Sequence, residues 1–270
     1  MINLSSFVDF HASRTPERIA IVFGAERISY SALSRRVALT AGWLASRGIG
    51  QGDVVAVLMK NSAAFVEIAI AVGHIGGVFL PINFRLSADE VGYITGDAGA
   101  KLLIADAELA ASAALATDVV LLDAAVQADS TRLGLDAVPA ARVARQPSDL
   151  FRLMYTSGTT DRPKGVMHSY ENFYWKCSDH VVALGLTAEN RLLVAGPLYH
   201  VGAFDLPGMA VLWVGGMLCI LRDFSPEAAL EAIAREKLDC AWLAPVMTSA
   251  MLAAAAASGL DLNSLRWVIG

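Results

Sequence analysis

The sequence predicts an α/β protein of two packed lobes, each a mainly parallel sheet flanked by helices. Short apolar runs alternate along the 270 residues with longer amphipathic segments. Many of these runs are apolar throughout, which is typical of strands that helices cover on both faces. About nine such runs occur, and because nine strands are many for one open sheet, two lobes are favoured.

The first third of the chain illustrates this alternation. A helix is predicted from near Ser31 to just before Gly48, since glycine favours the left-handed conformation that follows a helix. Residues 53–59 are rich in β-branched side chains and predict a strand. Asn61 is the expected N-cap of the next helix. Residues 77–82 then predict the following strand.

The later elements continue the series. Ser87 and Glu90 form an S-x-x-E capping box, which predicts the start of another helix. Further strands are predicted at residues 100–106, 118–123, 150–155, 191–196, 216–221, 238–244 and 265–270. Residues 124–148 are the least regular stretch and are expected to form a surface excursion.

The predicted lobes divide the chain unevenly. We expect residues 1–55 and 183–270 to form one discontinuous lobe, truncated at its end. Residues 56–182 are expected to form the second lobe, which carries the polar segment 155–166.

Composition excludes several classes of protein. The net charge of −5 is spread along the chain, so nothing indicates a nucleic-acid partner. Cys177, Cys219 and Cys240 lie far apart in apolar surroundings, so we expect buried core residues and neither a zinc site nor disulfides. This cysteine usage suits the reducing cytoplasm, which is the predicted location.

Secretion and membrane insertion are also disfavoured. The N-terminus lacks the basic start and unbroken apolar run of a signal peptide. Residues 63–82 approach membrane-spanning length but contain Glu67, His74 and a Gly–Gly pair, which are costly in lipid. We therefore expect no transmembrane segment.

The segment YTSGTTDRPKGV, residues 155–166, has the composition of an anion-binding loop. It is expected to join the carboxyl end of a strand to a helix that begins near Ser169, where open α/β sheets bind ligands. Gly158 and Gly165 allow backbone N–H groups to approach a ligand, and Lys164 supplies a positive charge. Hydroxyl donors come from Thr156, Ser157, Thr159 and Thr160.

A Walker loop is the first alternative for this segment. Gly158 and Lys164 are spaced as in GxxxxGK[ST]. However, Pro163 replaces the second glycine and removes a backbone donor, and Gly165 replaces the hydroxyl residue that binds magnesium. A P-loop kinase or GTPase is therefore disfavoured.

The same segment resembles the phosphate-loop signature of the adenylate-forming superfamily, which includes acyl-CoA synthetases, luciferases and peptide-synthetase adenylation domains. Residues 28–62, residues 81–106 and PLYHVGAF at 197–204 are also similar to blocks of this family, so the resemblance covers essentially the whole chain. It implies the fold of the large N-terminal domain of acyl-CoA synthetases, incomplete at its C-terminus.

The resemblance also implies an activity. Thr156, Ser157, Gly158, Thr159, Thr160 and Lys164 take the role of holding the β- and γ-phosphates of ATP. A carboxylate then attacks the α-phosphorus to give acyl-AMP and pyrophosphate, and coenzyme A takes the acyl group. The adenine-binding segment, the Mg²⁺ ligand and the mobile C-terminal domain with its lysine would follow residue 270. We therefore expect no complete catalytic set and no metal ligand in this chain, which alone is expected to be inactive.

A second site is implied by PLYHVGAF. In acyl-CoA synthetases a similar segment lines the carboxylic acid pocket, and this role is carried to Tyr199, His200, Gly202 and Ala203. The alternative for His200 is a helix cap or a filler of a core gap. Small residues at 202 and 203 are expected to leave room for the substrate.

The surroundings of this segment bear on which acid is bound. The segment is neutral and apolar, and Asp205 falls later than the acidic position of amino-acid adenylation domains, so a fatty or other apolar acid is favoured. Trp242 and Met247 either shape the pocket or pack as core residues. The other histidines, His11, His74, His168 and His180, receive no role beyond structure or surface.

Two functions remain open from the sequence. The chain is either the N-terminal part of an AMP-forming acyl-CoA synthetase or a truncated, non-catalytic homologue that binds a ligand or partner. Turnover of ATP and an acid distinguishes them.

Asp161 departs from the family pattern, which has glycine at this position. Aspartate tolerates a left-handed backbone better than most residues, so the turn survives. Its charge beside a triphosphate is unfavourable unless Arg162 or solvent compensates it. We expect Asp161→Gly in the whole protein to lower the Michaelis constant for ATP in a steady-state assay. An unchanged Michaelis constant would mean that Asp161 does not weaken ATP binding.

Overall fold

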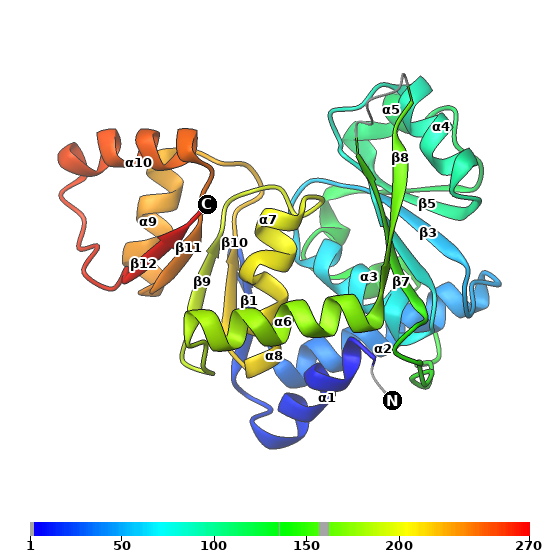
Figure 1. Cartoon of the computed structure of the whole chain (residues 1–270), viewed down its shortest axis with the longest axis horizontal. Helices are drawn as coiled ribbons and strands as arrows, with labels where there is room; N and C mark the ends of the chain where they lie inside the picture. Colours follow the sequence, from blue (N-terminus) through cyan, green and yellow to red (C-terminus); the bar gives the residue numbers. More distant parts are fainter. Residues whose placement is uncertain (1–2, 135, 157–161) are drawn as a thin grey trace. The chain divides into compact units, whose positions relative to one another are not determined.

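The computed structural model describes residues 3–134, 136–156 and 162–270, and the chain forms two compact units (Figure 1). Unit 1 consists of Met1–Ser6, Leu33–Lys60 and Ala64–Trp175, and unit 2 consists of Phe7–Ala32, Asn61–Ala63 and Lys176–Gly270. The boundary predicted at residue 55 is therefore wrong. It would cut through β3 (Val54–Leu58), which pairs with a neighbouring strand of unit 1 on each side. The boundary predicted at 182 falls instead at 175.

Unit 1 contains a six-stranded sheet in the order β6-β5-β3-β4-β7-β8. Its remaining strands are β4 (Val78–Pro81), β5 (Ala100–Asp106), β6 (Val119–Leu122), β7 (Leu150–Thr156) and β8 (Lys164–Ser169). All pairs are parallel except β7 with β8, so the mainly parallel sheet predicted for this lobe is confirmed. Every residue of β3 and β4 is buried, as expected of strands covered on both faces.

The helices of unit 1 follow from local signals. They include most of α2 (Tyr30–Ser46), α3 (Ala63–His74), α4 (Ala88–Asp97) and α5 (Ala110–Ala113), with short 3₁₀ turns η1 (Ala107–Leu109), η2 (Ala124–Val126) and η3 (Ser130–Leu133). The capping box of Ser87 and Glu90 is confirmed, because each side chain accepts a hydrogen bond from the other residue's backbone N–H. Gly48 has φ +77° just past α2, as predicted.

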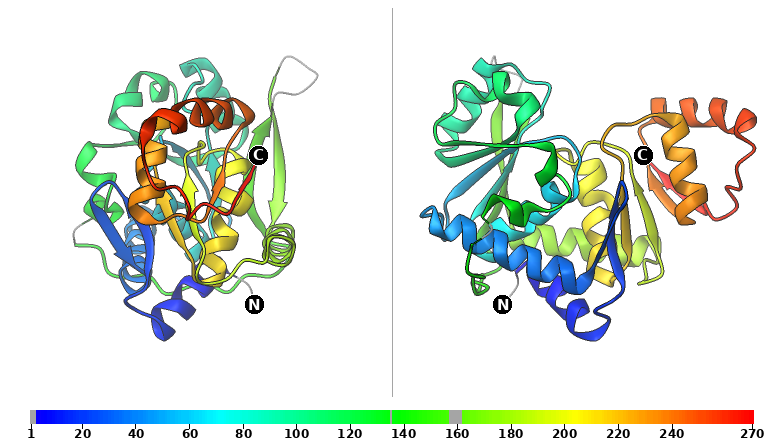
Figure 2. Two further views of the ribbon diagram at one scale, coloured as in Figure 1. Left: turned by 90° about the vertical axis from the view of Figure 1, so that its left-hand side faces the viewer. Right: turned by 180° about the vertical axis from the view of Figure 1, so that it is seen from behind.

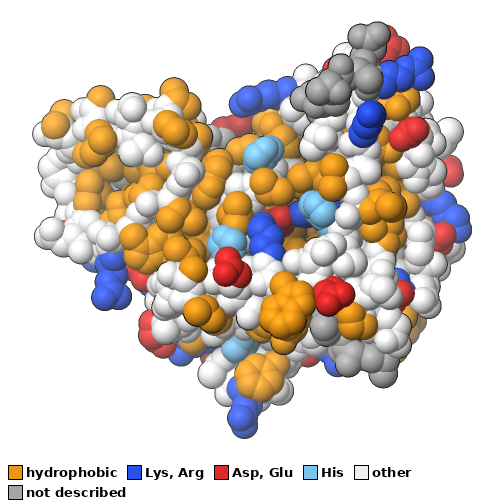
Figure 3. Space-filling model, in the orientation of Figure 1, with side chains coloured by type: hydrophobic (Ala, Val, Ile, Leu, Met, Phe, Trp, Pro, Cys, Tyr) orange, Lys and Arg blue, Asp and Glu red, His pale blue; other side chains and the backbone are white. Residues whose placement is uncertain are grey.

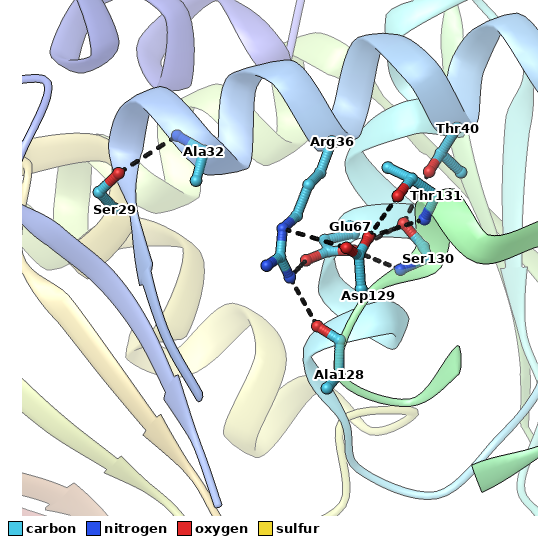
Figure 4. Close-up of polar contacts among 9 residues, drawn as sticks. All are labelled: Ser29, Ala32, Arg36, Thr40, Glu67, Ala128, Asp129, Ser130 and Thr131. Atoms are coloured by element: carbon cyan, nitrogen blue, oxygen red, sulfur yellow. Dashed lines mark hydrogen bonds and ion pairs between the residues drawn. The ribbon is translucent and has the colours of Figure 1, made fainter. Parts of the chain in front are cut away.

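A buried polar network fixes the irregular segment after β6 (Figure 4). The carboxylate of Glu67 on α3 is fully buried and accepts hydrogen bonds from the backbone N–H of Ser130, at 2.9 Å, and from its hydroxyl, at 2.6 Å. Its other oxygen lies 3.3 Å from Arg36 Nη1 on α2. Burial raises the pKa of Glu67, and the Ser130 hydrogen bonds and the Arg36 charge oppose that shift. The Ser130 hydroxyl also lies 2.6 Å from the Thr40 hydroxyl on α2, so the excursion predicted at 124–148 is tied at Ser130 to two helices.

Unit 2 contains the second six-stranded sheet, in the order β12-β11-β9-β10-β1-β2. Its strands are β1 (Ile19–Phe23), β2 (Glu26–Ser29), β9 (Arg191–Val194), β10 (Met217–Ile220), β11 (Cys240–Trp242) and β12 (Trp267–Ile269). Only β1 with β2 is antiparallel. Each unit thus has one antiparallel strand at a sheet edge, visible from further sides in Figure 2.

The helices assigned wholly or largely to unit 2 are α1 (Ser5–Arg14), α6 (Tyr170–Leu184), α7 (Val201–Ala203), α8 (Ala210–Val214), α9 (Pro226–Glu236) and α10 (Pro245–Ser258), with a π-helical stretch η4 (Phe204–Met209). In α10 only Met247 and Met251 are buried, whereas Val246 and Leu252 are 75% and 70% exposed. Apolar side chains are accordingly visible over this part of the surface in Figure 3. One side of α10 packs on its unit and the other faces outward.

Twelve strands occur in the described residues, against about nine predicted. The strands missed are β1, β2 and β8. β2 and β8 are edge strands with exposed positions, so they lack the continuous apolar character used to find the others. The three cysteines are buried, as expected. Among the described residues, no helix combines the length and apolar character needed to cross a bilayer.

Glu236 predicts a stability change with pH. Burial by itself would raise the pKa of Glu236, but hydrogen bonds and charges from Arg27 and Arg235 outweigh it and hold the pKa below the ordinary 4.5. A carboxylate with a lowered folded pKa stabilises the protein above pH 4.5, and this contribution is lost as the pH falls through the folded pKa. We expect Glu236→Gln to lower the free energy of unfolding by about 1.5 to 3 kcal/mol at pH 7.

At pH 3 the difference between Glu236→Gln and the wild type should be smaller. Urea unfolding of both proteins at the two pH values measures it. Equal losses at both pH values would contradict an ionised, paired Glu236.

Candidate functional site

The polar segment 155–166 belongs to unit 1 and connects two antiparallel strands. Thr156 ends β7 and is the Cα partner of Lys164, which begins β8, and the pairing continues to Leu150 and Ser169. The prediction that this segment joins a strand directly to a helix is therefore wrong. Residues 164–169 extend as a strand before α6 begins, because a strand at a sheet edge tolerates the polar composition that suggested a loop.

The structure describes two of the six predicted phosphate-binding residues. Thr156 and Lys164 are both exposed and face each other across the ribbon of β7 and β8. Ser157, Gly158, Thr159 and Thr160 lie outside the described residues, as does Asp161. A hydroxyl residue and a lysine are thus Cα partners at the end of the ribbon where β7 ends and β8 begins.

Residues of α4 contact the same end of the ribbon. The Tyr155 hydroxyl donates a hydrogen bond of 2.6 Å to Asp97 Oδ2. The Tyr93 hydroxyl lies 3.4 Å from the carbonyl oxygen of Pro163, and the Arg162 guanidinium lies 5.1 Å from the centroid of the Tyr93 ring. Sequence reasoning missed these contacts, although Tyr93 and Asp97 have the i, i+4 spacing of residues on one helix face.

Gly165 has a packing role that the sequence did not predict. It is the cross-strand partner of Tyr155, and a Cβ atom at Gly165 would lie 3.0 Å from the Tyr155 ring. The absence of a side chain therefore makes room for the aromatic ring across the ribbon.

The predicted acid-pocket segment lies in unit 2, between β9 and η4. Tyr199 is partly buried, His200 is exposed, and Gly202 and Ala203 are buried. His200 Nδ1 accepts a hydrogen bond of 3.3 Å from the backbone N–H of Gly202 and forms the N-cap of α7. The capping alternative for His200 thus describes its contact in this structure. The proton of a neutral ring then resides on Nε2.

Asn61 holds this segment in place. Its side-chain oxygen accepts from the backbone N–H of Leu198 at 2.8 Å, and its amide donates to the carbonyl oxygens of Gly196 and Leu221 at 2.8 and 3.1 Å. The prediction that Asn61 caps α3 is therefore wrong, because backbone groups distant in the sequence use both ends of its amide. The connections that follow β9 and β10 thus meet at one buried side chain.

The space expected beside Gly202 is occupied by Trp242 at the end of β11. A Cβ atom at Gly196 would lie 2.5 Å from the indole ring, and one at Gly202 would overlap it. The small residues therefore accommodate an aromatic ring, which corrects the prediction that they leave an open space. Met247 is buried in the core of unit 2, in agreement with its packing alternative.

Comparison with known proteins identifies the family. The sequence profile described as "AMP-binding enzyme" matches residues 8–270. The chain belongs to the AMP-binding enzyme family. A feruloyl-CoA synthase from Amycolatopsis sp. is 36% identical over 267 residues, which are 98% of this chain and 53% of that protein. A 2-succinylbenzoate–CoA ligase from Geobacillus sp. (strain WCH70) is 33% identical over 243 residues, 88% of this chain and 47% of the ligase.

Solved structures of the AMP-binding enzyme family agree with the fold. The inhibitor-bound N-terminal domain of FACL13 from Mycobacterium tuberculosis superposes with a TM-score of 0.90 and 27% identity, covering 99% of this chain and 69% of that one. The O-succinylbenzoate coenzyme A synthetase MenE from Bacillus subtilis, in complex with AMP, gives 0.85 and 25%, covering 98% and 67%. The chain spans about half the length of the curated relatives it matches.

A buried ion pair lies next to the predicted acid-pocket segment. Asp205 in η4 is 1% exposed, and its Oδ2 lies 3.2 Å from Lys176 Nζ on α6. The carboxylate nearest to His200 along the chain is therefore neutralised by a cation of the same unit. It is not an exposed anion.

The remaining histidines have structural contacts. Ring nitrogens of His11, His74 and His180 contact the carbonyl oxygens of Trp213, Ala140 and Lys176, and His168 accepts from Arg152. Within residues 3–134, 136–156 and 162–270, no group of three or more His, Cys, Asp or Glu side chains is arranged to hold a metal ion.

Proposed function

We propose that this chain supplies the ATP-phosphate site and part of the acid pocket of an AMP-forming acid–thiol ligase. The whole protein converts a carboxylic acid to acyl-AMP and pyrophosphate and then transfers the acyl group to coenzyme A. The observation that carries this proposal is the segment 155–166, which brings Thr156 opposite Lys164 in a member of the AMP-binding enzyme family. We place the reaction in the cytoplasm, and this chain alone is proposed to be inactive.

In the proposed reaction a substrate carboxylate oxygen attacks the α-phosphorus of ATP, and the bond to the pyrophosphate oxygen breaks. The negative charge that moves onto pyrophosphate must be stabilised, and such reactions depend on positioning and charge neutralisation. Lys164 supplies the positive charge, and the hydroxyls of Thr156, Ser157, Thr159 and Thr160 supply donors with the amide of Gly158. The ligand of Mg²⁺ is proposed to lie in the part of the whole protein that this chain does not include, so no step is assigned to the metal here.

The proposed substrate is an apolar carboxylic acid, either fatty or aromatic. Asp205 is paired with Lys176, so it does not offer a free anion to a substrate ammonium group. The Trp242 indole presents an apolar surface beside Gly196 and Gly202. Ferulate, 2-succinylbenzoate and indoleacetate, the acids named for three relatives, all contain an aromatic ring, and a long-chain fatty acid is named for a fourth.

Exchange of radioactive pyrophosphate into ATP tests the proposed function. The whole protein is assayed with aryl and fatty acids of graded length, beside the 270-residue chain. We expect acid-dependent exchange with the whole protein and none with the chain. Exchange by the chain alone would contradict the proposed fragment, and its absence from the whole protein with every acid would favour a non-catalytic homologue.

Trp242→Ala is expected to change acid selectivity. Removing the indole opens space beside Gly202, so longer or bulkier acids should gain about tenfold in kcat/KM relative to the preferred acid. Ratios of kcat/KM for the acid panel measure the effect. Trp175→Ala, which removes an indole that is 64% exposed on α6, is the matched control. An unchanged ratio in Trp242→Ala would exclude the indole from the acid pocket.

A further inference from the structure

Helix α4 forms a fixed support beside the ribbon of β7 and β8. Its N-terminus is closed by the capping box, and Val91 and Ile94 are buried against the sheet of unit 1. Tyr93 and Asp97 lie one helical turn apart, so both reach the same neighbouring surface. That surface is the end of the ribbon which carries Thr156 and Lys164.

The ribbon of β7 and β8 needs such support because another strand, β4, lies beside it on one side only. β8 is the edge strand of its sheet, and its Val166 and Met167 side chains are 43% and 71% exposed. Two-stranded ribbons are marginally stable unless another element packs on them. The end that bears Thr156 and Lys164 would therefore fray most easily.

Three contacts oppose this fraying. The Tyr155 hydroxyl donates to Asp97 at 2.6 Å, Tyr93 reaches the Pro163 carbonyl, and Arg162 stacks on the Tyr93 ring. Tyr155 is the residue before Thr156, and Arg162 and Pro163 directly precede Lys164. The chain next to Thr156 and the chain next to Lys164 are thus both held by one helix.

We propose that Tyr93, Asp97 and Tyr155 are positioning residues, which hold Thr156 and Lys164 at the spacing needed to grip the phosphates of ATP. This inference rests on the proposed function. A change in α4 would then weaken ATP binding and leave binding of the carboxylic acid unaffected.

The Tyr155 contact persists across the working pH range. Burial, followed by the hydrogen bond and charge of Asp97, raises the pKa of the Tyr155 phenol above its ordinary value of 10.0. The phenol therefore stays protonated and remains the donor at neutral pH.

The test uses four variants of the whole protein. Tyr155→Phe removes the hydroxyl and keeps the ring over Gly165, and Asp97→Ala removes the acceptor. Asp97→Asn keeps an oxygen that accepts from Tyr155 and should restore most of the wild-type behaviour. Tyr170→Phe is the control, since it removes a tyrosine hydroxyl bonded to the Gly73 carbonyl at the other end of the ribbon.

Hydrogen exchange measures the support directly. In Tyr155→Phe and Asp97→Ala we expect amide exchange in residues 164–167 to accelerate about tenfold, the factor that corresponds to one hydrogen bond. Exchange in α4 itself should not accelerate, because alanine near a helix C-terminus is at least as favourable as aspartate. Unchanged ribbon exchange in both variants would overturn the inference, whether or not the protein is an active ligase.

Steady-state kinetics test whether the contacts from α4 affect ATP binding. We expect the KM for ATP in pyrophosphate exchange to rise three- to tenfold in Tyr155→Phe and Asp97→Ala, with the KM for the acid unchanged. A merely structural role would lower the amount of active protein and leave both constants unchanged. That pattern would overturn the positioning role. An inactive wild type would instead refute the proposed function, and the hydrogen-exchange result would still decide whether α4 supports the ribbon.

Discussion

Replacing Lys164 with alanine is expected to lower the rate of acyl-adenylate formation by the whole protein about 100- to 1,000-fold, the usual effect of removing one preorganised group that stabilises a developing charge. Lys164 lies opposite Thr156 at the end of the ribbon and is exposed to solvent. In the proposed reaction negative charge builds on the departing pyrophosphate, so the loss should fall mainly on kcat and partly on the KM for ATP. Pyrophosphate exchange at saturating acid measures both constants.

Lys101→Ala is the matched control for Lys164→Ala. Lys101 is an exposed lysine of the same unit, and it pairs with Asp53 on the surface. Its replacement should leave exchange within twofold of wild type, since an exposed pair contributes only about 0 to 1 kcal/mol of stability. Wild-type activity in Lys164→Ala would contradict the proposed phosphate site.

Glu67→Ala is expected to lower the free energy of unfolding by about 3 to 5 kcal/mol, the range found when one partner of a buried ion pair is removed. The change leaves the Arg36 guanidinium, whose side chain is 12% exposed, without its closest carboxylate. It also removes the acceptor for both hydrogen bonds from Ser130 and leaves a cavity on α3.

Urea unfolding of the variant and the wild type measures this loss. Glu67→Gln is the informative companion, because its amide can accept from Ser130 only by turning its NH₂ group toward Arg36. We expect an intermediate loss for it and almost none for Lys101→Ala. A loss below about 1 kcal/mol for Glu67→Ala would place this pair among ordinary surface ion pairs.

Local signals in the sequence predict much of the fold. The Ser87–Glu90 capping box and the glycine after α2 depend on neighbours along the chain, and both have the expected geometry. Strands buried on both faces, such as β3 and β4, reveal themselves by composition. The composition of β8 does not identify it as a strand. β8 is an exposed edge strand, so its polar residues resemble those of a loop.

The candidate site shows where such reasoning ends. The packing of Trp242 on Gly202 and the hydrogen bonds from Asn61 to the 196–221 region join residues about 40 to 160 positions apart in the chain. Composition identifies Gly202 as small but does not identify what fills the space. The role of Asn61 was mistaken for the same reason, since its position before a helix also suits a cap.

The cross-strand register of β7 and β8 constrains how this region varies among relatives. Thr156 and Lys164 stay opposite each other if residues are gained or lost between positions 157 and 161, because the ladder below them is unchanged. One residue inserted between Gly165 and Ser169 slips that ladder, and since side chains alternate along a strand, Lys164 then turns to the opposite face. Insertions and deletions should therefore accumulate between positions 157 and 161 and be absent from β8.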